Sequence, residues 1–327
     1  FKMMVGDMVN EKQKGLAYSI QSFLCNAGSL VGFLFPFIFT WIGISNIAPQ
    51  GVVPDSVIYS FYIGAAILIL CVIYTTVKVK EMPPAEYAEY HGITEEEKKE
   101  KINMVKLLVK APKAFWTVGL VQFFCWFAFM FMWTYTNGSV AANVFDAPTV
   151  ETVVNGANKV VLDTKSIQYQ NAADWVGVLF AVQAIGSVLW AVCIPMFKNR
   201  KLIYSLSLVL GGIGFISTYF VHNQYVLFIS FLLIGCAWAA MLALPFTILT
   251  NALSGGHMGT YLGLFNGTIC IPQIVAATLG GSILALFTPK GMLPPEINML
   301  VMAGVVLIIG AVCVYLIKET KGEQAKA

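Results

Sequence analysis

Charged residues are few in this chain of 327 residues, since only 11% are Asp, Glu, Lys or Arg while 58% are hydrophobic. With a mean hydropathy of +0.75, the chain has too little polar surface to cover a soluble globule. The net charge of +3 is also too small to indicate a nucleic-acid partner. These shortages exclude a soluble domain and predict an all-α membrane protein that has the lipid bilayer as a partner.

Groups that carry enzyme chemistry are equally sparse. The three histidines, His91, His222 and His257, are far apart in the sequence, and the seven cysteines show no Cys-x-x-Cys pair and no spacing typical of metal ligands. No catalytic dyad or phosphate-binding loop is recognisable. We therefore expect no enzyme activity, no cofactor and no metal ion, and we interpret the cysteines as small apolar packing residues.

Long uncharged stretches dominate the sequence instead. A helix needs roughly 20 apolar residues to cross the hydrocarbon core of a bilayer, and eight stretches of suitable length contain no Asp, Glu, Lys or Arg. We predict about eight transmembrane helices, at 15–42, 57–77, 114–135, 175–197, 202–221, 225–249, 258–287 and 297–317.

Basic residues are distributed unevenly between the two sides of these spans. When loops are counted alternately, one side receives both ends of the chain, the lysines of 78–113 and the segment 198–201 (KNRK). The other side receives only Lys159, Lys165 and Lys290. Because Lys and Arg accumulate in short cytoplasmic loops, we expect both ends to be cytoplasmic, in a multi-pass protein of a bacterial inner membrane.

Two connecting segments are long enough to have structure of their own. In 78–113, Thr94 and Glu97 form a capping box, and apolar residues then recur at helical spacing opposite lysines. This pattern predicts an amphipathic helix, either as a plain linker or as a regulatory element. On the other side, residues 150–162 are rich in β-formers around Asn155 and Gly156, which predicts a β-hairpin.

Uncharged polar and aromatic residues recur at helical spacing within the spans. Gln122 and Trp126 share a stripe in the third span, Gln183 and Trp190 share one in the fourth, and Trp238 lies near the middle of the sixth. Sugar hydroxyls hydrogen-bond to amides and sugar C–H faces stack on aromatic rings, so such stripes suit a sugar path. The same side chains could instead join helices or fill the core, and both interpretations stay open.

Several segments resemble a known family. Residues 259–266 (GTYLGLFN) and 271–274 (IPQI) resemble the eleventh helix of the sucrose and glycoside–pentoside–hexuronide cation symporters, a group of the major facilitator superfamily. Asn266 and Gln273, seven residues apart, share one face of that helix. Similarity to the family's tenth helix, its seventh helix and the segment that leaves its fourth is found at 244–246 (LPF), 122–127 (QFFCWF) and 2–7 (KMMVGD).

The resemblance implies two six-helix bundles joined by a cytoplasmic linker. The chain would then be truncated at its N-terminus and would hold the end of helix four and helices five to twelve. The preceding helices of the same protein would be its missing partners. The implied units are 1–80, the remainder of the first bundle; 81–113, the linker; 114–318, the second bundle; and 319–327, a cytoplasmic tail.

The resemblance also implies coupling to H⁺ or Na⁺. Lys2 matches a basic residue on the family's fourth helix and Asp7 lies at the membrane exit, so we expect both to take part in coupling. Relatives of plant sucrose carriers have an acidic residue near the outer end of helix seven, where residues 135–138 are YTNG in this chain. We therefore expect any ion-coupling carboxylate to come from the preceding helices.

The resulting prediction is a secondary active transporter that moves a mono- or disaccharide such as sucrose or maltose by cation symport, with alternating access around a site near the midplane. Two alternatives stay open: a major facilitator carrier of another small solute, and a non-transporting multispan binding or assembly protein. The substrate-binding residues that we predict are Gln122, Trp126, Gln183, Trp190, Trp238, Asn266 and Gln273.

Overall fold

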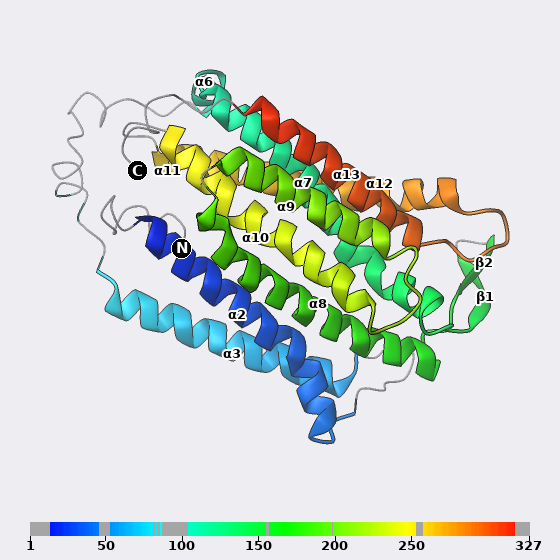
Figure 1. The fold of residues 1–327 in the computed structure, drawn as a ribbon. Coiled ribbons are helices and arrows are strands. Elements are labelled where there is room, and N and C mark those ends of the chain that lie inside the picture. Colours follow the sequence, from blue (N-terminus) through cyan, green and yellow to red (C-terminus); the bar gives the residue numbers. More distant parts are fainter. Residues whose placement is uncertain are drawn as a thin grey trace.

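The computed structural model of the chain describes residues 14–45, 53–80, 83, 86, 104–154, 157–197, 199–252 and 258–317. Long helices running side by side make up most of this part of the chain (Figure 1). Within it, eight helical segments are long and apolar enough to cross a membrane. The chain is therefore an all-α, multi-pass membrane protein, as its composition predicts.

Each of the eight predicted spans is a helix in the structure. Short 3₁₀ turns, Ile194–Met196 and Val314–Leu316, extend two of them, and one span is divided into two helices. The spanning helices are α2 (Lys14–Trp41), α3 (Asp55–Lys78), α7 (Lys113–Asn143), α8 (Ile167–Cys193), α9 (Arg200–Ser217), α10 (Leu227–Ala252), α11 (Met258–Phe265) with α12 (Gly267–Phe287), and α13 (Ile297–Cys313).

Helix α8 begins eight residues before the span predicted from hydropathy. Ser166 caps it, since the Ser166 hydroxyl accepts a hydrogen bond from the Tyr169 backbone N–H at 3.2 Å and so satisfies a donor of the first turn. The added turns bring Asp174 into the helix. The predicted stretches contain no acidic residue, but the helices are longer than those stretches, so that α8 includes Asp174 and α3 begins at Asp55.

The predicted hairpin is present and defines one end of the bundle. Strands β1 (Thr149–Val154) and β2 (Ala157–Leu162) pair antiparallel, with Val154 opposite Ala157; residues 155 and 156 lie outside the described part. At the opposite end, helix α6 (Met104–Val109) belongs to the predicted amphipathic helix, whereas the capping box lies outside the described residues. We call these the hairpin end and the linker end of the molecule (Figure 1).

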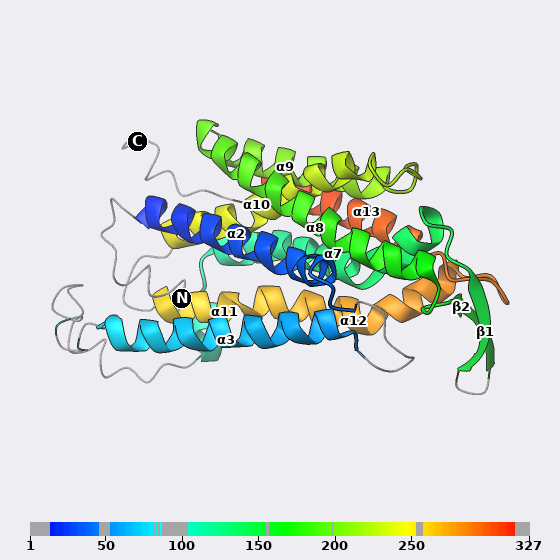
Figure 2. The ribbon, with the colours of Figure 1, turned by 90° about the horizontal axis from the view of Figure 1, so that it is seen from below.

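The helices differ in how many neighbours they have. Helix α10 packs on α7, α8 and α9, while α13 packs on α7 and α9. These contacts form the core of the part of the chain from α7 to α13. Helix α2 joins this group through α8, and α3 packs chiefly on α2. Figure 2 shows α3 and the α11–α12 pair on one side of the layer that contains α2, α7 and α8, with α9 on the other side.

Glycines allow α8 and α10 to approach each other closely. A Cβ atom on Gly235 of α10 would overlap the backbone oxygen of Gln183, and one on Gly186 of α8 would lie 2.7 Å from the backbone oxygen of Leu232. Small residues at such crossings maximise packing between helices in lipid, where apolar burial alone gives little drive to association. This contact fixes the position of the polar stripe of α8 beside α10.

Candidate functional site

An aromatic cluster lies where α7 faces α10. The ring of Trp238 lies 5.8 Å from that of Trp126, 5.8 Å from that of Trp133 and 5.0 Å from that of Phe129. By the helical rise, Trp126 lies about 20 Å along α7 from Lys113, and Trp238 lies about 17 Å along α10 from Leu227 at the other end. The cluster is therefore near mid-depth of the bundle, and it unites two of the predicted site residues, Trp126 and Trp238.

Two polar groups on the same face of α7 have unsatisfied hydrogen-bonding capacity. The Gln122 amide nitrogen donates to the backbone oxygen of Met241 on α10 at 2.8 Å. The Gln122 side-chain oxygen and the indole N–H of Trp126 are both buried without a partner among the described residues. Because an unpaired buried polar group costs about 1–3 kcal/mol, a helix pair that keeps one acceptor and one donor free favours a ligand that would satisfy both.

One residue of the polar stripe of α8, Ser187, meets α2. Ser187 donates through its hydroxyl to the Asn26 side-chain oxygen at 3.2 Å, and both residues are buried. Gln183, one turn earlier on α8, is also buried, with its backbone against Gly235. Asn26 was not among the predicted site residues. The available signal was an amide within an uncharged stretch, because such a group must find a partner in lipid.

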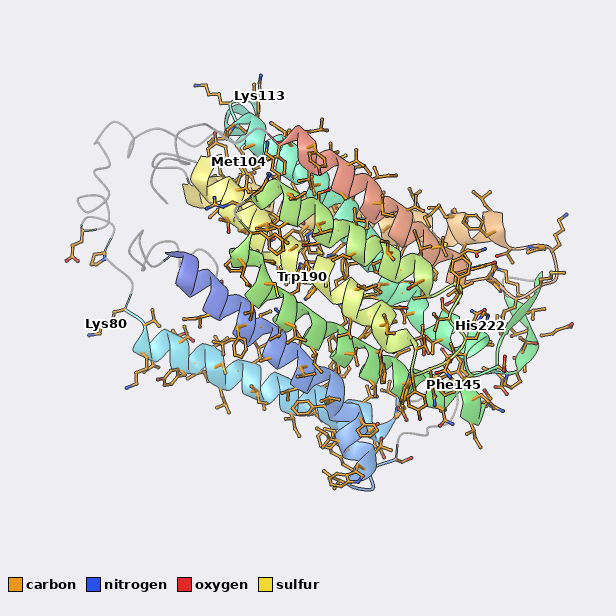
Figure 3. The ribbon with its side chains drawn as sticks, viewed as in Figure 1. Lys80, Met104, Lys113, Phe145, Trp190 and His222 are labelled. Atoms are coloured by element: carbon orange, nitrogen blue, oxygen red, sulfur yellow. The ribbon has the colours of Figure 1, made fainter. Side chains whose placement is uncertain are left out.

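Trp190 has a different surrounding from the other predicted tryptophans. Its indole N–H donates to the Ser207 hydroxyl of α9 at 2.8 Å, and Ser207 in turn donates to the Ile203 backbone oxygen at 2.6 Å. The label in Figure 3 marks it among the helices. The structure thus gives Trp190 a satisfied contact with α9, the arrangement that the packing interpretation requires, and does not join it to the aromatic cluster.

Asn266 and Gln273 lie on the helix pair at the edge of the bundle. Asn266 occupies the break between α11 and α12 and is exposed, while Gln273 is half-buried. The face of α12 that packs on α7 carries small residues, including Ala276 and Gly280. Pro272 within α12 lacks the N–H that would continue the helical hydrogen bonds, which favours a local change of direction. Neither amide is hydrogen-bonded to the Gln122 side chain, which bonds to Met241 and has no other partner among the described residues.

Lys2 and Asp7, the predicted coupling residues, lie outside the described residues.

A cavity of about 240 Å³ lies at the hairpin end of the molecule and not near the aromatic cluster. It is lined by Phe37, Phe145, Asn171, Asp174, Trp175, Val178 and Gln224. In the part of the chain that the structure describes, no three His, Cys, Asp or Glu side chains are grouped as metal ligands.

Comparison with known proteins supplies one match. The family model of the Major Facilitator Superfamily matches residues 2–157 and 149–327, which together span nearly the whole chain. The match identifies the superfamily and no subgroup. No curated protein matches the chain significantly.

Proposed function

The chain belongs to the Major Facilitator Superfamily, and from that premise we propose that this membrane transporter carries a sugar. The cargo is a mono- or disaccharide such as sucrose or maltose, which the protein moves by alternating access and cation symport, with H⁺ or Na⁺ as the coupling ion. The resemblance of 259–274 to sugar symporters supports this cargo, and the polar and aromatic groups of α7 and α10 support it independently.

The observation that carries the proposal is the pair of unsatisfied groups on α7. The Gln122 oxygen can accept a hydrogen bond from a sugar hydroxyl, and the Trp126 N–H can donate one to a sugar oxygen. The rings of Trp126, Trp133 and Trp238 provide faces on which the C–H side of a pyranose could stack. A polyol needs donors, acceptors and an apolar face together, and this part of the bundle supplies all three.

The absence of charge beside this cluster favours an uncharged cargo. Beyond Lys113 at its first position, α7 has no charged residue, and α10 and α12 have none. An ionic substrate at mid-depth would need an opposite charge, because an unpaired charge in a low-dielectric environment is expensive. The helices that hold the aromatic cluster therefore suit a neutral solute.

The orientation follows from the basic residues under this proposal. Figure 3 shows Lys80 and Lys113 at the linker end, whereas His222 and Phe145 lie at the hairpin end. Arg200 and Lys201 also begin α9 from the linker end. We propose that the linker end is cytoplasmic and that the hairpin end faces the outside of a bacterial inner membrane.

Uptake of labelled sucrose and maltose into vesicles that carry this chain together with the helices that the resemblance places before it tests the proposal, with and without an imposed proton or sodium gradient. Accumulation that depends on one gradient would identify the cargo and the ion. If neither sugar accumulates or competes while the protein is folded and abundant, the sugar proposal fails, and another solute or a non-transporting role takes its place.

The Trp126→Phe variant then assigns the site. It keeps a ring but removes the free N–H, so we expect a roughly tenfold higher KM, the effect of losing about 1.4 kcal/mol, at unchanged abundance. Trp116→Phe is the matched control, because Trp116 is exposed near the linker end of the same helix. Equal KM values in the two variants would remove Trp126 from the site.

A further inference from the structure

Glu296 lies in an unusual position at the hairpin end of the helices α7 to α13. It is the residue immediately before α13, outside the apolar span that begins at Ile297, and its side chain is partly buried. Its carboxyl group is seated against Gly138 of α7, since a Cβ atom on Gly138 would overlap the carboxyl carbon and both oxygens. The absence of a side chain at 138 thus creates the space that the carboxyl group fills.

The groups that face this carboxyl come from two other helices. Tyr135 of α7 and Tyr169 of α8 are both close enough to interact electrostatically with the Glu296 carboxyl group. The Asn137 amide nitrogen donates to the Tyr169 hydroxyl at 2.9 Å, and the Asn137 side-chain oxygen is buried with no partner among the described residues. Glu296 is therefore among phenol and amide groups, where a protonated carboxyl would have acceptors available.

No cation compensates the carboxyl within the described part of the chain. No ion pair to Glu296 is formed there, and the first turn of α13 contains no charged residue. Lys290 in the preceding loop is exposed, as are Lys159 of β2 and Lys165 before α8. Burial without a partner disfavours the ionised form, and desolvation raises the pKa of the Glu296 carboxyl from 4.5 to about 7.

We propose that Glu296 is a proton-binding site that makes closure of the hairpin end depend on pH. The protonated carboxyl stays in its pocket against Gly138 and allows α7, α8 and α13 to pack together. When the end opens, water reaches the carboxyl, and its proton passes to bulk water on the hairpin side. The place of this step in a transport cycle rests on the proposed function, but the protonation itself needs no sugar.

The direction of the pH effect follows from linkage. The packed arrangement binds the proton more tightly than an open, hydrated one, so closure is favoured at low pH. As the pH rises from about 4.5 through about 7, the packed arrangement loses stability, because its carboxyl must either ionise without a partner or leave the pocket. The hairpin end should therefore open more readily above neutral pH.

Infrared spectroscopy of the reconstituted protein tests the protonation directly. We expect a protonated-carboxyl C=O band that titrates with a midpoint near pH 7, as the pKa of about 7 requires. The band should be absent in Glu296→Gln and retained in Glu151→Gln, a matched change of an exposed acid in the hairpin. A band that persists in Glu296→Gln, or no band that titrates near neutrality, would overturn the proposal.

Cysteine labelling tests the link to opening. Val140, which is 4% exposed, lines a small void of about 10 Å³ with Ile297, whereas Thr164 at the same end is exposed. We expect the labelling rate of Val140→Cys, divided by that of Thr164→Cys, to rise roughly tenfold between about pH 6 and about pH 8, following the ionised fraction. The ratio should be flat when Glu296→Gln is added.

The outcomes separate this inference from the sugar proposal. Failed sugar uptake with an intact titrating band would remove the proposed cargo and leave the proton site. A labelling ratio that does not change with pH in the presence of Glu296 would refute the coupling to opening, whatever the cargo is.

Discussion

Helices α3 and α10 have the same hydropathy and opposite degrees of burial. Their apolar spans, Asp55–Lys78 and Leu227–Leu249, each have a mean hydropathy of 2.4. Only 6% of the residues in the apolar stretch of α3 are buried within the described chain, whereas 61% of those in the stretch of α10 are buried. Hydropathy therefore identifies a helix that can enter a membrane, but it does not say whether lipid or protein surrounds that helix.

Residue size explains part of the difference. Helix α10 carries a run of small residues, including Gly235, Ala237 and Ala240, that lets neighbouring backbones approach. Helix α3 also contains Gly64, but an added Cβ atom there meets nothing within 4 Å. A small residue contributes to packing only where a neighbour uses the space that it leaves, so the comparison can be tested by matched substitutions in the two parts.

Removal of a large ring should have the greatest effect. Phe129 is fully buried and contacts the rings of Trp238 and Phe215, so Phe129→Ala should lower the free energy of unfolding by about 3–5 kcal/mol. Phe61→Ala on α3, where the side chain is 74% exposed, should have little effect. Thermal unfolding in detergent micelles measures both, and equal losses would mean that α3 is as tightly packed as α7.

Addition of one methyl group should have a smaller effect. Gly235→Ala forces a Cβ atom into the backbone of α8 and should cost about 1–3 kcal/mol. Gly64→Ala has open space around it and should be neutral or slightly stabilising, because Ala favours a helix. Thermal unfolding in detergent micelles measures the stability of both variants. A loss of stability in Gly64→Ala would show that α3 has a close neighbour.

The hydrogen bond between α2 and α8 should have the smallest effect. A double-mutant cycle of Asn26→Ala and Ser187→Ala should give a coupling energy of about 0.6 kcal/mol, a typical value for polar pairs between membrane helices. Ser217 and Ser230, whose hydroxyl oxygens lie 2.8 Å apart on α9 and α10, provide the control pair. A coupling of zero for the first pair alone would mean that α2 is held by apolar contacts.

Much of the fold was predictable because it depends on local properties. The eight spans follow from the cost of placing charge in lipid, and the hairpin follows from β-formers around an Asn-Gly turn. The helix ends were less predictable. The cap at Ser166 extends α8 into polar sequence, and Asn266 separates α11 from α12 within a single apolar stretch.

The candidate site was predictable only in part. Helical spacing placed Gln122 and Trp126 on one face of α7, and the structure adds Trp238 from a helix more than a hundred residues away. Spacing also aligned Gln183 with Trp190, whose indole instead donates to Ser207 of α9. A stripe specifies which side chains share a face, but the neighbouring helix decides what that face contacts.

The sequence alone determined that this protein is a bundle of membrane-spanning helices, because hydropathy and charge act on each segment independently. It also determined which polar groups those helices carry. Only the tertiary structure decided that Gln122 and Trp126 keep free polar groups, that Asn26 meets Ser187 and that Glu296 fills the space beside Gly138. These outcomes depend on contacts between residues distant in the sequence, and no local pattern contains that information.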